Sequence, residues 1–192
     1  MESNIREDAT DESSIRLWFQ AMRRIPGQSS DAAIERLSYW KANSDSIDAR
    51  FYLFILHSLR CMDGNSGARD SAQSLLRECR TLAQGMPNRH YAREWFGTGT
   101  GLKRIVPSNE LGEWEQAFDR LDRLALVEGR IISMRGPESG EIELTCGLKA
   151  FFVPARGHRG SAFYREKDEN AQVRFCLAFA YDGLVAWATR GT

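Results

Sequence analysis

The stretch GTGTGLKR, residues 97–104, combines residue types that could hold a phosphate group. Its three glycines at alternate positions would let backbone N–H groups approach an anion, and Lys103 and Arg104 follow with positive charge. A Walker-type loop has Gly before the Lys and Ser or Thr after it, but here Leu102 and Arg104 occupy those places. The preceding segment RHYAREWF, residues 89–96, has the apolar spacing of a helix. The favoured interpretation of the glycine-rich stretch is therefore a flexible connector.

Two basic segments are candidates for binding a nucleotide or single-stranded nucleic acid. Residues 77–104 hold six Arg or Lys against two Glu, and residues 156–167 mix cations with aromatic residues. Guanidinium groups bind phosphate bidentately, and neighbouring rings stack on bases. Solvated loop charges are the alternative interpretation. The candidate ligand-binding residues are Lys103, Arg104, Arg93, Phe152, Arg156, Arg159, Tyr164 and Arg165.

The sequence gives no constellation that predicts catalysis. The chain has only three histidines, and no motif links any of them to a nucleophile. Glu141 and Glu143 lie on one face of a predicted strand and are interpreted as an exposed structural pair. His57 and Cys61 have metal-ligand spacing on a helix, but no second ligand pair accompanies them. We therefore expect a protein that is not an enzyme and has neither a metal nor a cofactor.

The composition is that of a folded protein whose positive and negative charges balance, so that it has no strong overall electrostatic field. The 192 residues are 42% hydrophobic, and 26 Lys and Arg balance 26 Asp and Glu. The sequence contains no apolar run of membrane-spanning length, and the first residues lack signal-peptide features, so we expect a cytoplasmic protein that does not bind membranes. The four cysteines are far apart, which predicts buried thiols rather than disulfides.

Apolar residues recur at helical spacing through the first half of the chain. After a polar tail, residues 1–12, the pattern predicts a helical domain over residues 13–96, with a cap for its second helix at Ser30 or Asp31. The segment SIDARFYLFILHSLRCM, residues 46–62, is apolar nearly all round and should be the most buried helix. A glycine-rich connector and an amphipathic bridging helix then occupy residues 97–124.

The helical half resembles tetratricopeptide repeats over about residues 13–85. Trp18 and Tyr52 are 34 residues apart, which is the period of those units, although the usual Pro after the second helix is missing. A generic helical bundle remains the alternative. The resemblance implies a groove that binds a partner protein, for which Trp40, Tyr52 and Phe54 are the candidate residues.

The pattern changes to alternation of period two after residue 125. Five strand-like runs separated by turn residues predict a small five-stranded barrel over residues 125–192, so the fold class is α+β. The order of features, with AFFVPA as third strand and SGEIEL as second, resembles the cold-shock domain. That resemblance implies that Phe152 is an exposed stacking aromatic, with Phe151 and Val153 pointing inward.

The second predicted strand departs from the cold-shock pattern. Glu141 and Glu143 stand where that family places aromatic residues. Stacking supplies about 1–3 kcal/mol per base, and phosphates repel carboxylates. We therefore expect this face not to bind nucleic acid as cold-shock domains do.

The combination of helical repeats, the segment EWFGTGTGLKRIV and a small barrel is similar to C-terminal regions of bacterial anti-phage conflict-system proteins. That similarity implies a sensor or adaptor that acts through a partner protein. The leading hypothesis is thus a non-enzymatic adaptor. The alternative is a nucleotide or single-stranded nucleic-acid binding module that uses the basic connector and barrel loop.

Overall fold

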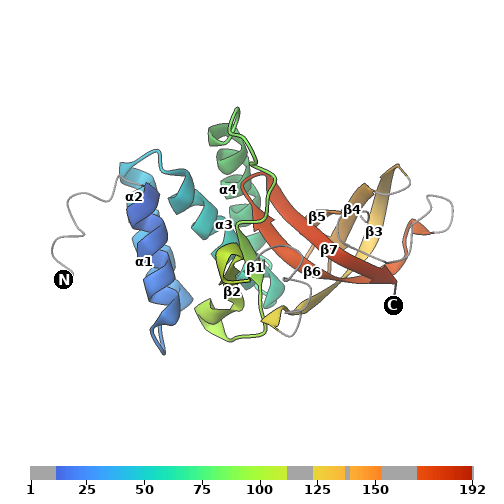
Figure 1. The fold of residues 1–192 in the computed structure, drawn as a ribbon, viewed down its shortest axis with the longest axis horizontal. Helices are drawn as coiled ribbons and strands as arrows, with labels where there is room; N and C mark the ends of the chain where they lie inside the picture. Colours follow the sequence, from blue (N-terminus) through green and yellow to red (C-terminus); the bar gives the residue numbers. More distant parts are fainter. Residues whose placement is uncertain (1–11, 112–122, 137–138, 153–167, 192) are drawn as a thin grey trace. The chain divides into compact units, whose positions relative to one another are not determined.

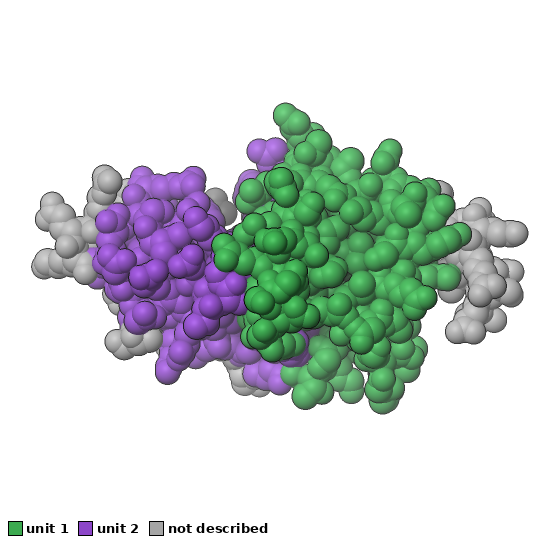
Figure 2. Space-filling view, turned by 180° about the vertical axis from the view of Figure 1, so that it is seen from behind, with its two compact units in different colours: residues 1–87, 99–103 green, residues 88–98, 104–192 purple. Residues whose placement is uncertain are grey.

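The computed structural model describes residues 12–111, 123–136, 139–152 and 168–191. They form two compact units (Figure 2). The helical unit contains residues up to Pro87 together with Gly99–Lys103, and the barrel unit contains Asn88–Thr98 and the chain from Arg104 onward. Residues of the predicted connector therefore contribute to both units.

Four helices build the helical unit: α1 (Glu12–Arg24), α2 (Ser30–Asn43), α3 (Ile47–Met62) and α4 (Ala68–Leu82) (Figure 1). Ser29 caps α2, one residue before the predicted cap, because its side chain accepts a hydrogen bond from the N–H of Ala32 at 3.2 Å. The N-terminus of α3 receives two caps. Ser46 accepts from the N–H of Ala49, and the carboxylate of Glu12 accepts from Ile47 and Asp48.

Aromatic packing around α3 forms the core of the helical unit. The rings of Phe19 and Tyr52 stack with centroids 4.0 Å apart, and Trp18 meets Trp40 edge to face at 4.8 Å. The prediction that this helix is the most buried one is confirmed, since twelve of its sixteen residues are buried. Most of the predicted bridging helix, residues 110–124, lies outside the described residues.

Five strands form the predicted barrel: β3 (Leu126–Gly136), β4 (Ser139–Leu144), β5 (Lys149–Phe152), β6 (Gln172–Ala180) and β7 (Gly183–Gly191). Their order is β6-β3-β4-β5-β7, and a further pairing of β7 with β6 closes the ring. All neighbours are antiparallel except β5 and β7, which run parallel. This order and closure are those of the oligonucleotide/oligosaccharide-binding type of barrel, so the predicted fold class is confirmed.

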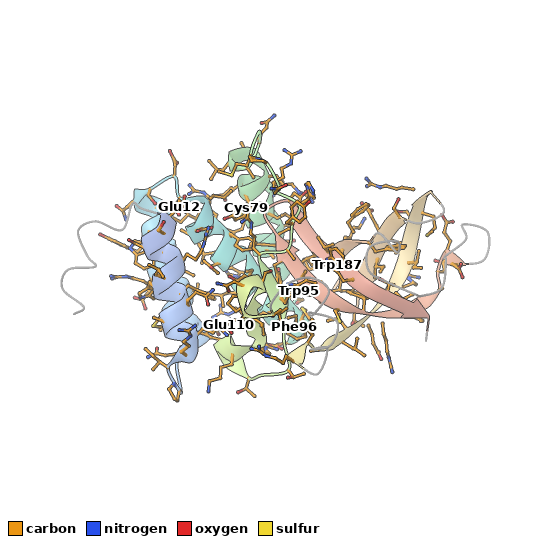
Figure 3. The ribbon with its side chains drawn as sticks, viewed as in Figure 1. Glu12, Cys79, Trp95, Phe96, Glu110 and Trp187 are labelled. Carbon is orange, nitrogen blue, oxygen red and sulfur yellow. The ribbon has the colours of Figure 1, made fainter. Side chains whose placement is uncertain are left out.

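Two short strands, β1 (Glu94–Phe96) and β2 (Ile105–Pro107), extend the sheet beyond β6. The prediction of a helix over residues 89–96 is wrong. Residues 94–96 form a strand, in which Trp95 pairs with Val106 on one side and with Ala178 on the other. Trp95 is buried in a small apolar cluster, and its ring lies 6.1 Å from that of Trp187 (Figure 3). Two 3-10 turns, η1 (Gly101–Arg104) and η2 (Ser108–Glu110), flank β2.

Candidate functional site

The glycine-rich stretch is the loop of the β1–β2 hairpin. Its ends are tied by a 2.7 Å hydrogen bond from the N–H of Gly97 to the carbonyl of Arg104. A Cβ on Gly99 would lie 2.8 Å from the carbonyl oxygen of Lys103, and Gly101 has a φ of +54°. The glycines therefore serve a tight turn, which argues against both a phosphate-cradling P-loop and a flexible connector.

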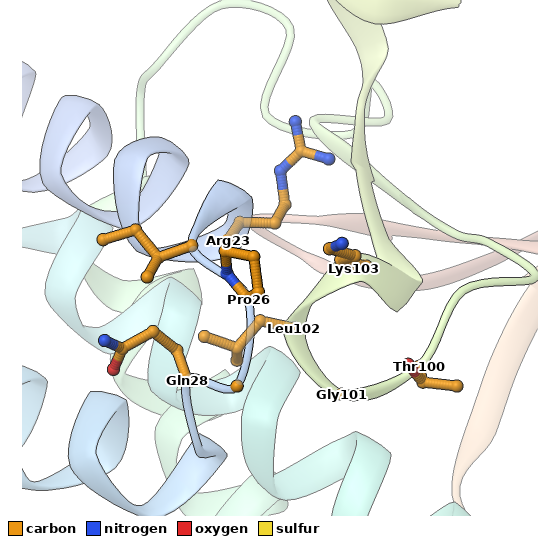
Figure 4. Close-up of a pocket in the computed structure, with 9 residues that line it drawn as sticks. Arg23, Pro26, Gln28, Thr100, Gly101, Leu102 and Lys103 are labelled. Atoms are coloured by element: carbon orange, nitrogen blue, oxygen red, sulfur yellow. The ribbon is translucent and has the colours of Figure 1, made fainter.

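A pocket of about 290 Å³ lies within the helical unit, where this loop meets the turn after α1 (Figure 4). Figure 4 shows Leu102 projecting toward Pro26 among the lining side chains. The pocket is lined by Arg23, Ile25, Pro26, Gly27, Gln28, Thr100, Gly101, Leu102 and Lys103. The described lining residues include two cations, an amide and a hydroxyl, and none of them is acidic or aromatic. Such a lining can hold an anion and an apolar group, but it offers no ring on which a base could stack.

The two cations of the pocket differ in their surroundings. Arg23 is 7% exposed, and its Nε donates to the Oε1 of Gln20 at 3.2 Å, one helical turn earlier. Lys103 is exposed, and its backbone N–H donates to the carbonyl of Thr100 at 3.1 Å. A guanidinium with restricted rotation and an accessible ammonium together can bind a phosphate or carboxylate group.

Among the predicted ligand-binding residues that the structure describes, Lys103 alone lines this pocket. Arg93 and Arg104 instead pack on rings of the barrel unit, with their guanidinium carbons 4.9 Å from the Tyr181 centroid and 5.7 Å from the Phe96 centroid. The predicted residues Arg156, Arg159, Tyr164 and Arg165 lie outside the described residues.

The predicted orientation of the third barrel strand is wrong. Phe152 is fully buried, whereas Phe151 is 39% exposed on the outer face. The strand pairing gives the reason, because Phe152 lies opposite Gly140, whose missing side chain leaves room for a ring inside the barrel. Phe152 is therefore a core residue and not a stacking surface.

The outward orientation of Glu141 and Glu143 is as predicted. The side chains of β4 alternate between partly exposed and buried, with both glutamates on the partly exposed face. Arg135 donates to Glu141 at 2.6 Å, and Arg130 donates to Glu143 at 3.3 Å, both from the neighbouring strand β3. These two ion pairs neutralise Arg130 and Arg135, which weakens the attraction of these two arginines for phosphate groups.

The three residues predicted to bind a partner protein are core residues. Trp40, Tyr52 and Phe54 are each at most 3% exposed, so a partner cannot contact them on the surface of the helical unit.

Burial shifts the pKa values of one side chain on α3 and one on α4. Burial and, to a lesser extent, the charge of Lys41 lower the pKa of His57, whose Nδ1 is buried without a hydrogen-bond partner in the described structure. Burial, reinforced by the charge of Glu78, raises the pKa of the Cys79 thiol to about 12. No group of three or more His, Cys, Asp or Glu that could hold a metal ion occurs among the described residues.

No family model, curated protein or solved structure matches this chain. The tetratricopeptide and conflict-system resemblances therefore gain no support from the comparisons. No helix in the described part of the chain is long and apolar enough to span a membrane.

The lining residues that were not predicted as site residues include the three polar ones, Arg23, Gln28 and Thr100. Arg23 ends an amphipathic helix, and its contribution to a pocket depends on a loop about eighty residues later in the chain. The local signal was limited to two glycine-containing turns, PGQ at residues 26–28 and TGLK at residues 100–103, with basic residues nearby at Arg24 and Arg104.

Proposed function

We propose that this chain is a non-enzymatic binding module for a small phosphate-bearing ligand of nucleoside monophosphate size, held in the pocket between Arg23 and Lys103. The observation that carries the proposal is the charge of the lining, because Arg23 and Lys103 both line the pocket and the described lining residues include no carboxylate. Charge-assisted hydrogen bonds to phosphate are about twice as strong as neutral ones.

The size of the pocket limits the ligand class. A volume of about 290 Å³ is at the small end of ligand pockets, which start at about 300 Å³. The apolar side chains of Ile25, Pro26 and Leu102 can contact a sugar or a base edge, while Thr100 and Gln28 offer hydrogen bonds. A short phosphorylated ligand fits these features better than a polynucleotide, which would need an extended basic groove.

A calorimetric titration of the full chain with AMP, ATP and inorganic phosphate tests the proposal. We expect AMP to bind, and we expect its affinity to fall as sodium chloride rises from low to high concentration, because the Lys103 ammonium is exposed to screening. Lys103→Gln should weaken binding about tenfold or more, since a hydrogen bond to a charged group contributes about 1.5–3 kcal/mol.

Lys149→Gln is the matched control, because Lys149 is an exposed lysine on the barrel strand β5 and lies outside the pocket. Equal loss of affinity in both variants would point to nonspecific charge attraction. An absence of heat and of thermal stabilisation with all three phosphates at millimolar concentration would refute the proposal.

The adaptor role stays a prediction, and its partner-binding residues require revision. The aromatic residues assigned to it are needed for the helical core, so a partner protein would have to use other surfaces.

A further inference from the structure

Four of the nine described lining residues of the pocket come from a loop whose two ends belong to the barrel unit. Residues Thr100–Lys103 line the pocket and group with the helical unit, whereas the chain up to Thr98 and from Arg104 onward groups with the barrel unit. We infer that the β1–β2 hairpin positions Lys103 for the ligand, so that ligand binding in the pocket and pairing of this hairpin stabilise each other. This inference rests on the proposed function and concerns how the site is regulated.

The loop has little freedom to place Lys103 in another way. Because Gly99 has no Cβ, its backbone approaches that of Lys103, and an added Cβ would lie 2.8 Å from the Lys103 carbonyl oxygen and 2.9 Å from its Cβ. Leu102 is 3% exposed and anchors the tip of the loop in the helical unit. Lys103 is thus fixed by Gly99 on one side and by the buried Leu102 on the other.

The stem of the hairpin, which consists of β1 and β2, is paired with the barrel strand β6. The N–H of Arg93 donates to the carbonyl of Phe179 at 2.8 Å, and Trp95 lies opposite Ala178 in the register of β1 and β6. The indole Nε1 of Trp95 donates to the hydroxyl of Ser108 at 3.0 Å, which ties β1 to the residue that follows β2. The ends of the loop are therefore held at the distance that this pairing sets.

Close packing at Gly97, at the base of the loop, supports the same conclusion. Gly97 closes the loop, and a Cβ at that position would lie 2.6 Å from the Cγ2 of Val106 and 2.9 Å from the carbonyl oxygen of Arg123. The pairing of Phe96 with Ile105 then continues directly into the stem. Loosening the stem would release the loop that carries Lys103, and by thermodynamic reciprocity a ligand held by Lys103 must favour the paired stem.

Two measurements on the full chain test this linkage. Hydrogen exchange followed by mass spectrometry, with and without saturating AMP, should show slower exchange in peptides covering residues 93–98 and 104–108. Calorimetry of Gly99→Ala should show AMP affinity reduced about tenfold, as if a charge-assisted contact were lost, although Gly99 does not line the pocket. Gly67→Ala is the control, because its added Cβ meets only the Oδ1 of Asn65 at an ordinary 3.4 Å.

A second variant covers the case in which Gly99→Ala does not fold. Ser108→Ala removes the hydroxyl that accepts from Trp95 and donates to the carbonyl of Ala92, and it leaves every residue of the pocket unchanged. We expect this variant to bind AMP more weakly and to exchange faster over residues 93–98. Full affinity in the folded variants, together with AMP-independent exchange in the hairpin, would overturn the linkage but leave the proposed function intact. Failure of the unsubstituted chain to bind AMP, ATP or inorganic phosphate would overturn both.

Discussion

The orientation of the third barrel strand can be tested by truncating its two neighbouring phenylalanines. Phe152 is fully buried opposite Gly140, whereas Phe151 is 39% exposed opposite Glu141. Removing a fully buried phenylalanine ring leaves a cavity and costs about 3–5 kcal/mol. The ring of Phe151 already contacts water, so its removal should cost about 1 kcal/mol.

Urea unfolding provides the assay for these two variants. Taking a slope of about 2 kcal/mol per molar urea, Phe152→Ala should lower the midpoint of barrel unfolding by about 2 M, and Phe151→Ala by about 0.5 M. Replacing Trp18, Trp40 and Trp114 by Phe in the common background leaves Trp95 and Trp187, both in the barrel unit, as the fluorescent reporters of barrel unfolding. Equal losses, or a larger loss for Phe151→Ala, would refute the inward orientation of Phe152.

Three further outcomes follow from the helical unit and the cysteines. Glu12→Ala should lower the free energy of unfolding of the helical unit by about 2 kcal/mol in chemical denaturation, because the Glu12 carboxylate accepts three hydrogen bonds at the start of α3; unchanged stability would contradict this capping role. A thiol reagent at pH 8 should label the half-buried Cys146 first, because Cys79 is buried and its pKa is raised to about 12; mass spectrometry of labelled peptides that finds Cys79 modified first would contradict this order. Because the pKa of His57 is lowered from 6.5, the unfolded chain binds a proton there at a higher pH than the folded chain does. The free energy of unfolding should therefore fall as the pH decreases below 6.5. His57→Gln should make that decrease smaller in chemical denaturation, whereas the control His90→Gln should not.

The elements of this fold could be predicted from local patterns because each is long and strongly periodic. The helix SIDARFYLFILHSLRCM formed near its predicted bounds, and five strands formed within residues 125–192 as predicted. Apolar residues at these spacings can be buried only on a helix or a strand, so local sequence suffices for the type of element.

Features that depend on pairing between distant segments could not be predicted in this way. Glu94–Phe96 is a strand because it pairs with Ala178 and Phe179, and three residues carry no periodicity of their own. The inward direction of Phe152 follows from its register with Gly140, which alternation along β5 alone does not define. Arg23 and Lys103 likewise reach one pocket only through the folded hairpin loop.

The ion pairs on the outer face of the barrel have a consequence for its affinity for single-stranded nucleic acid. Arg130, Arg135, Lys149 and the half-exposed Phe151 are already on that face, and the carboxylates of Glu141 and Glu143 neutralise two of these cations. Exchanging both glutamates for tyrosine would uncover the two arginines and add two rings beside Phe151. Two substitutions on the outer face, with no change in the interior of the barrel, would thus suffice to change its affinity for single-stranded nucleic acid.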